Sequence, residues 1–261
     1  MDELSGFYKL SIDERLAKIK KIVGLTDEET KLLTESGALK LDRADKIVEN
    51  VIGAVHIPLG LGLNFVINGK QILIPMAVEE PSVIAAACKA AKLTLPDGFK
   101  AEADESIMFG QIQLVNIKDM EQAIKNIELN RKKIMDIAHE YMKPHERFGC
   151  GARDFEIKKF NTSRGDMVVL DFSIAVGDAQ GANMVNTVLE NVSPVLAQLT
   201  GAKVRLRIIS NLATKRKTRA TAVWKKEIIG EEAIEGVLDA YEFAKVDVYR
   251  CATHNKGIMN G

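Results

Sequence analysis

The chain has 261 residues, and its 36 basic and 36 acidic side chains leave no formal net charge, so the composition favours no polyanionic partner. Hydrophobic residues make up 46% and charged residues 28%, which excludes a disordered chain and predicts a globular protein of one large or two modest domains. The three cysteines have no CxxC spacing and indicate neither a disulfide framework nor a metal site. Without an apolar leader or a long apolar segment, we expect a cytoplasmic protein with no membrane partner.

The first part of the chain carries helix signals. Ser11 with Glu14, and Thr26 with Glu29, have the spacing of capping boxes, and apolar residues at helical intervals follow each pair. Gly37 is a typical stop for the second helix. The expected helices cover residues 11–23, 26–37 and 44–51.

A hairpin and a small-residue helix are predicted next. Asn68-Gly69 separates two apolar runs, 63–67 and 71–78, and this dipeptide between strands is a strong hairpin signal. Pro81 is expected at the first position of a helix that continues through the alanine-rich residues 83–91.

The element order changes at about residue 106. The pattern there predicts β-α-β-β-α-β, the order of a ferredoxin-like unit with two helices on one face of an antiparallel sheet. The expected strands are 107–117, 153–160, 167–176 and 204–212, and the expected helices are 119–138 and 182–199.

We therefore predict an α+β fold in which a helical and mixed large domain is interrupted by a ferredoxin-like domain. The large domain would comprise residues 1–105 and 214–261, and the insertion residues 106–213. After the insertion we expect a strand, a helix over 231–244 and a polar loop over 249–261.

Three segments are candidates for chemistry. Glu79 to Ser82 place two carboxylates and a hydroxyl before a helix, where the alternative is simple capping. The small-residue loop 177–183 leaves a strand and enters a helix, so its backbone can approach a phosphate closely, although a plain structural turn fits the pattern as well. Lys256 lies in the polar segment 249–261, where it is either an oxyanion-stabilising cation or part of a solvated loop.

A basic stretch over residues 203–226 offers a different interpretation. It resembles a nucleic-acid footprint, but ferredoxin-like RNA binders need aromatic side chains on the sheet face. The strand 167–176 offers only Phe172. Solvated strand faces or a phosphate-bearing small ligand fit this stretch better than RNA.

Several long motifs, in order along the whole chain, make it similar to one family. The chain resembles the bacterial and archaeal (class II) 3-hydroxy-3-methylglutaryl-CoA reductases. The motifs are Glu49-Asn50-Val51-Ile52-Gly53, Asn64-Phe65-Val66-Ile67-Asn68-Gly69, Val78-Glu79-Glu80-Pro81-Ser82, Asp178-Ala179-Gln180-Gly181-Ala182-Asn183, Ser210-Asn211-Leu212-Ala213 and residues 252–261.

The resemblance implies an enzyme that reduces hydroxymethylglutaryl-CoA to mevalonate with two NAD(P)H, or runs the reverse reaction, as a dimer with the substrate in the large domain and the cofactor in the insertion. It implies that Glu80 and Lys256 are catalytic. The implied substrate contacts are Ser82, Asn211, Arg250, Thr253 and Asn260, and the implied cofactor contacts are Asp178, Ala179, Gly181, Ala182 and Asn183.

The chain departs from the family pattern at three positions. Gln180 replaces the usual methionine, Val248 a common proline, and Cys150 interrupts a run that is usually all glycine. No charge is removed, so the resemblance implies altered affinity rather than lost chemistry. Residues 141–145 contain no acid to select the NAD ribose, which favours NADPH.

Family chains also continue beyond the position of Gly261 and carry there a catalytic aspartate and a histidine. We therefore expect turnover to need a second polypeptide or the remainder of the gene product. A non-catalytic subunit that binds CoA or nucleotide is the main alternative to a reductase.

Overall fold

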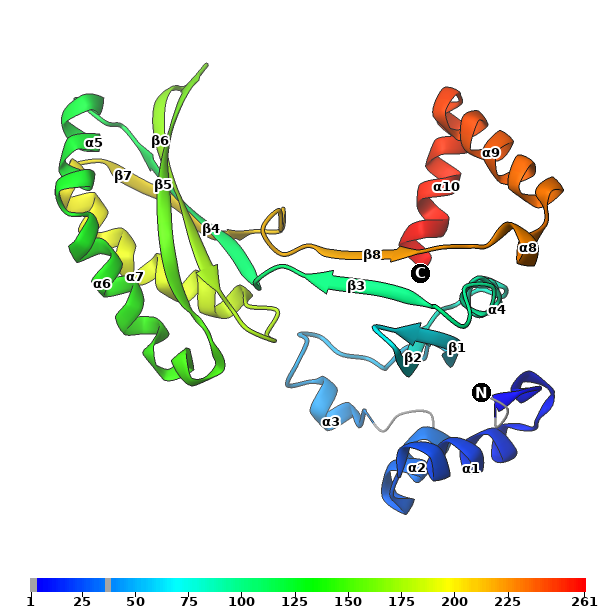
Figure 1. The fold of residues 1–261 in the computed structure, drawn as a ribbon. Coiled ribbons are helices and arrows are strands. Elements are labelled where there is room, and N and C mark those ends of the chain that lie inside the picture. Colours follow the sequence, from blue (N-terminus) through cyan, green and yellow to red (C-terminus); the bar gives the residue numbers. More distant parts are fainter. Residues whose placement is uncertain (1–3, 36–38) are drawn as a thin grey trace. The chain divides into compact units, whose positions relative to one another are not determined.

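The computed structural model describes residues 4–35 and 39–261 (Figure 1). The chain forms two compact units. Unit 1 comprises residues 1–101 and 220–261, and unit 2 comprises residues 102–219. We describe each unit by itself.

Unit 1 begins with short helices, whose bounds are η2 Phe7–Lys9, α1 Ile12–Val23, α2 Asp27–Thr34 and α3 Leu41–Ala44. Both predicted capping boxes are confirmed: the Ser11 side chain accepts from the Glu14 N–H, and each acidic side chain accepts from the N–H of its cap residue. The third predicted helix is wrong beyond Ala44, because Asn50 has a left-handed φ of 57° that a helix cannot hold. The expected stop at Gly37 lies outside the described residues.

The predicted hairpin is confirmed by the antiparallel strands β1 (Leu59–Ile67) and β2 (Lys70–Ala77). Its turn residues Asn68 and Gly69 both have positive φ, 50° and 77°, as a type I′ turn requires. The strands β3 (Phe99–Ala103) and β8 (Thr218–Ala222) complete a sheet of order β2-β1-β3-β8.

Helix α4 (Val83–Lys92) packs against β1. A Cβ at Gly60 would lie 2.6 Å from the Ile84 Cδ1 atom, so the glycine permits this close packing. The predicted helical position of Pro81 is wrong. Ser82 is the N-cap with φ 76°, and this left-handed residue separates the proline from the helix.

The end of the chain is helical, with α8 Lys226–Ile229, α9 Glu231–Val246 and α10 Val248–Asn260. The expected polar loop over 249–261 is therefore wrong. The Asp247 carboxylate accepts the Arg250 N–H at 2.6 Å and satisfies a free donor of the first turn. The polar residues of this segment thus lie on a helix.

Unit 2 contains an antiparallel sheet of order β5-β6-β4-β7, with α5, α6 and α7 on one face (Figure 1). The side chains of β4 alternate between buried and partly buried, as a sheet with one covered face requires. The bounds are β4 Ile107–Val115, α5 Met120–Leu129, α6 Arg131–Met142, η3 Lys143–Phe148, β5 Gly151–Thr162, β6 Gly165–Ala175, α7 Ala182–Thr200 and β7 Lys203–Ser210.

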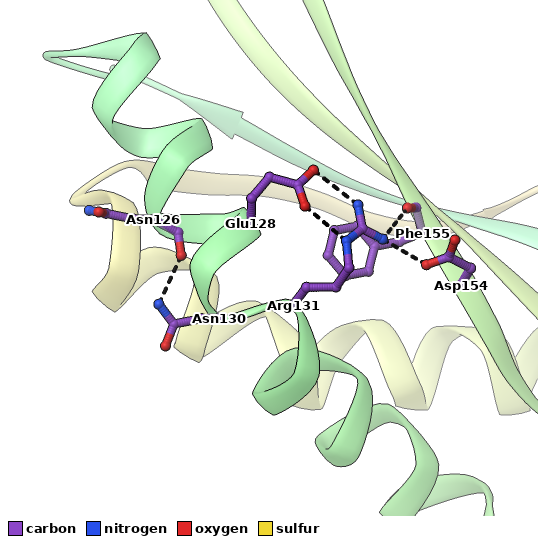
Figure 2. A network of polar contacts seen from close by, with 6 residues as sticks. All are labelled: Asn126, Glu128, Asn130, Arg131, Asp154 and Phe155. Carbon is purple, nitrogen blue, oxygen red and sulfur yellow. Dashed lines mark hydrogen bonds and ion pairs between the residues drawn. The ribbon is translucent and has the colours of Figure 1, made fainter.

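The helix expected over 119–138 is in fact two helices, because Asn130 leaves the helical conformation with φ −106° and ψ 13°. Arg131 fixes this break (Figure 2). Its guanidinium donates to both Glu128 oxygens, to Asp154 at 2.6 Å and to the Phe155 carbonyl at 2.9 Å, and it lies 4.1 Å from the Phe155 ring centroid. The guanidinium lowers the pKa of Glu128.

The chain crosses from one unit to the other on β3 and β8. At this crossing the Asp104 carboxylate accepts from the Arg219 guanidinium at 2.7 Å and from the Lys217 N–H at 3.3 Å. The Arg219 bond is the main reason why the pKa of Asp104 is lowered. In the described part of the chain, no helix has both the length and the apolarity to cross a membrane.

Candidate active site and cofactor loop

Glu80 lies in the bend between β2 and α4, and its side chain is 39% exposed. The Lys256 Nζ atom lies 2.5 Å from the Glu80 Oε1 atom. The Asn260 amide donates to the same oxygen. These residues are 176 and 180 positions from Glu80 in the sequence, so the fold of unit 1 brings them together.

Helix α10 presents the polar residues of this site. Thr253, Lys256 and Asn260 are three and four residues apart and therefore share one face of the helix. The Thr253 hydroxyl donates to the Tyr249 carbonyl at 2.8 Å, which holds that side chain against its own helix. The exposed Lys256–Glu80 pair adds little to stability by itself.

A surface hollow of about 370 Å³ lies beside Glu80. Its lining includes Glu79, Glu80, Ser82 and the apolar residues Leu59 and Ile84. A concave, mostly apolar surface with a few convergent polar groups is typical of small-molecule sites. This hollow is therefore a candidate entrance for a ligand that reaches the Glu80–Lys256 pair.

Of the remaining predicted substrate contacts, Ser82 lines the hollow beside Glu80, whereas Arg250 and Asn211 do not. Arg250 lies on α10, with its guanidinium 5.7 Å from the Phe243 ring centroid. Ser82 lies two residues after Glu80 at the start of α4, and its hydroxyl makes no capping bond. Asn211 follows β7 and is exposed in unit 2.

The predicted cofactor loop lies between β6 and α7 in unit 2, as expected from the sequence. Gly177 and Gly181 have φ of 57° and 95°, and Cβ atoms there would lie 2.8 Å from the Phe148 carbonyl and 2.6 Å from the Val176 side chain. Both positions therefore require glycine. The Ala182 N–H donates to the Gln180 side-chain oxygen at 2.9 Å, which fixes the loop at the start of the helix.

Arg216, a residue of the basic stretch 203–226, contacts this loop. Its guanidinium donates to the Ala179 carbonyl at 2.9 Å and to the Gln180 carbonyl at 3.3 Å. In the sequence Arg216 is one of a run of basic residues, and its 37-residue separation from Ala179 gives no signal of the contact. Only the small-residue loop itself was detectable.

Carboxylates neutralise part of the basic stretch. Arg219, Lys225 and Lys226 are paired with nearby carboxylates in the structure. Phe172 is fully buried in the core of unit 2 and cannot stack on a base. Phe172 thus offers no stacking surface to RNA, and the absence of a nucleic-acid partner stays a prediction from the sequence.

The chain matches a known protein family over nearly its whole length. A family model described as "Hydroxymethylglutaryl-coenzyme A reductase" matches residues 11–261. The chain belongs to this family. A 3-hydroxy-3-methylglutaryl-coenzyme A reductase of Archaeoglobus fulgidus is 47% identical over 260 residues, which cover 99% of this chain and 59% of the relative. A probable reductase of Borreliella burgdorferi is 27% identical over 100% of this chain and 62% of its own length.

Solved structures of the family agree with this fold. A Streptococcus pneumoniae 3-hydroxy-3-methylglutaryl-coenzyme A reductase superposes with a TM-score of 0.90 at 32% identity, covering 99% of this chain and 71% of that one. A class II reductase of the same organism, bound to NADPH in open conformations, has a TM-score of 0.88. The resemblance to class II reductases is confirmed, and the chain spans about 60% of the first two curated relatives' lengths.

Proposed function

We propose that the protein reduces hydroxymethylglutaryl-CoA to mevalonate and CoA with two NAD(P)H, or catalyses the reverse reaction. The observation that carries this proposal is the contact of Glu80 with Lys256 and Asn260 across 176 and 180 residues of sequence. Family membership supports it, because the relatives carry the name of this activity.

Lys256 and Glu80 have the chemistry that two hydride transfers to a carbonyl carbon require. As hydride reaches the carbonyl, negative charge develops on the oxygen, and an ammonium placed there stabilises it. A carboxyl group 2.5 Å from that ammonium can donate or accept the proton that the oxygen exchanges. We assign Lys256 as the oxyanion-stabilising cation and Glu80 as the proton-handling group.

The substrate's hydroxymethylglutaryl group needs polar partners for its free carboxylate and its hydroxyl. We propose that Ser82, Asn211, Arg250, Thr253 and Asn260 supply them. Arg250 is the cation in this set, and a guanidinium binds a carboxylate through two parallel hydrogen bonds. Thr253 and Asn260 share the helix face of Lys256, which supports their assignment to the same ligand.

We propose that unit 2, residues 102–219, contains a ferredoxin-like nicotinamide-cofactor domain over residues 106–213 that is inserted in a substrate domain. The strands and helices follow the β-α-β-β-α-β order except that α5 and α6 together take the place of the first helix, and the sheet order is β5-β6-β4-β7; both support this assignment. In the loop, Asp178, Ala179, Gly181, Ala182 and Asn183 would contact the cofactor.

NADPH is the proposed cofactor. Lys143 and Arg147 lie in η3, whose Phe148 carbonyl packs against Gly177 at the start of the loop. Cations there suit a 2′-phosphate. A related structure is described as bound to NADPH. A higher kcat/KM with NADH than with NADPH would contradict this preference.

We further propose that the chain acts as a homodimer. Ile52, Val55 and Val246 in unit 1 are 80% or more exposed, and exposed apolar side chains of this kind are available for contact with a second copy. Sedimentation of the purified protein tests this point, and a monomer at micromolar concentration would contradict it. A cytoplasmic location stays a prediction from the sequence.

The experiment that tests the function is Lys256→Ala. Because turnover is expected to need the remainder of the gene product, the variant is assayed in a protein that includes it. We expect reduction of hydroxymethylglutaryl-CoA, followed by the loss of NADPH absorbance, to fall about 100- to 1000-fold, the usual loss when one oxyanion donor is removed. Lys245→Ala is the matched control, because Lys245 is also a half-exposed helical lysine paired with a glutamate. We expect the control to retain its activity within twofold. A Lys256→Ala variant that keeps more than a tenth of the rate would contradict the assignment.

A further inference from the structure

We propose that Arg216 is a positioning residue that sets the cofactor loop in the conformation that receives the dinucleotide. This inference rests on the proposed function, because it takes the loop 178–183 as the cofactor site. It adds a residue outside the loop and outside the family's small-residue motif.

The contact is built from two bonds to consecutive peptide groups. One guanidinium nitrogen donates to the Ala179 carbonyl at 2.9 Å, and the other donates to the Gln180 carbonyl at 3.3 Å. Arg216 is itself partly buried, while both carbonyls belong to loop residues without helix or strand bonds of their own. The planar guanidinium therefore holds two carbonyls that no helix or strand bond holds.

The two bonds orient N–H groups as well as carbonyls. In a trans peptide the C=O and the following N–H point in opposite directions within one plane. Because the carbonyls of Ala179 and Gln180 point to Arg216, the N–H groups of Gln180 and Gly181 point away from it. Within the described part of the chain neither N–H donates a hydrogen bond. Successive free N–H groups form a concave anion site, which suits the pyrophosphate of a dinucleotide.

Both ends of the loop are also fixed. One side chain that holds the residues between these ends can therefore determine the conformation of the whole loop. Gly177 and Gly181 pack against the Phe148 carbonyl and the Val176 side chain, and the Gln180 side chain accepts the Ala182 N–H. Between the two glycines, the Ala179 N–H donates to the Val176 carbonyl at 3.2 Å, and Arg216 holds the Ala179 and Gln180 carbonyls.

Two substitutions separate the geometry from the charge. Arg216→Lys keeps the positive charge but offers a point-like ammonium in place of the planar fork, and Arg216→Gln removes the charge. Arg205→Lys is the matched control, because Arg205 is an exposed arginine of the same unit on β7. Each variant is first shown to have an unchanged circular dichroism spectrum.

The first measurement is the mobility of the loop in the ligand-free chain. We expect ¹⁵N order parameters of Ala179, Gln180 and Gly181 near the rigid value of about 0.85 in the parent chain and below about 0.6 in Arg216→Gln. The Arg205→Lys control should match the parent. Equal order parameters in Arg216→Gln and the parent would overturn the proposal, whatever the chain binds.

The second measurement is NADPH affinity by fluorescence titration, with steady-state kinetics beside it. We expect both Arg216 variants to bind NADPH about tenfold more weakly and to raise its KM by the same factor, while kcat changes less than twofold. An Arg216→Lys variant with parental affinity would overturn the proposal, because charge alone would then suffice. A parent chain that binds no NADPH would instead overturn the proposed function, and the order parameters would still decide the role of Arg216.

Discussion

Glu80 accepts two donors, the Lys256 ammonium and the Asn260 amide, at a single carboxylate oxygen. The Glu80→Gln variant keeps the shape of this side chain but cannot carry a proton or a negative charge. We expect kcat to fall about 100- to 10,000-fold, the range for loss of a general acid or base, with an unchanged melting temperature because the pair is exposed.

The control for this variant is Glu242→Gln, which removes the carboxylate that pairs with Lys245 on α9. Its rate and melting temperature should both stay near those of the parent. If Glu80→Gln has the parental rate and pH–rate profile, Glu80 is only an acidic residue at the start of a helix.

The site could be predicted from the sequence only in part, because its residues are far apart in the chain. The motif around Glu80 and the residues of α10 each carried a family resemblance, but no spacing rule joins residues 176 positions apart. The contact of Arg216 with the loop could not be predicted either. Its partners are main-chain carbonyls, which every residue type has, and they are 36 and 37 residues away in the sequence.

At the scale of elements, Arg131 ties the start of α6 to the end of α5 and to β5, at the point where the two helices meet (Figure 2). Arg131→Ala removes bonds to two carboxylates and a carbonyl, and charged hydrogen bonds contribute about 1.5–3 kcal/mol. We expect unit 2 to lose about 2 kcal/mol of unfolding free energy in urea. Arg131→Lys should recover less than half of this loss, since a lysine cannot bind Glu128 through two nitrogens. Full recovery by lysine would show that only the charge matters.

Acid should loosen α1 and α2 before the rest of the chain. The bonds from the cap residues Ser11 and Thr26 lower the pKa of Glu14 and Glu29. A carboxyl with a lowered folded-state pKa stabilises the fold above its unfolded value of about 4.3, and this contribution is lost as the pH falls through the folded-state pKa. We expect hydrogen exchange in both helices to accelerate below about pH 4, relative to α7. If the Glu14→Gln variant has the same hydrogen-exchange protection in α1 as the parent at neutral pH, the Glu14 carboxylate does not stabilise this helix and the explanation is wrong.

The elements that the sequence predicted correctly are those with local signals. Capping boxes and the Asn68-Gly69 turn involve residues close in the chain, so their geometry follows from the residues themselves. The break at Asn130 depends on Asp154 and Phe155, more than 20 residues away, and could not be found locally. Helix α10 was missed although Asp247 is a cap residue, because its polar composition hid the helical period.

At the scale of the whole molecule, the hydrophobic core is concentrated in unit 2. Among the described residues, the largest fully buried side chains, such as Phe155, Phe172 and Leu170, all belong to it. We expect the slowest-exchanging amides of the dilute protein to lie in β4, β6 and α7, and those of β1 and β2 to exchange faster. Hydrogen exchange with mass spectrometry checks this order, and equal protection of both sheets would contradict it.

The crossing at Asp104 and Arg219 also bears on how the chain reaches its fold. These residues are 115 positions apart, and joining the ends of so long a flexible loop costs roughly 4 kcal/mol of entropy. If unit 2 folds first, its own collapse brings those ends together, and β8 can join β3 without that cost. During synthesis on a ribosome, the strands β1 to β3 are made long before β8, so the first sheet waits for its last strand with an open edge until the insertion has folded.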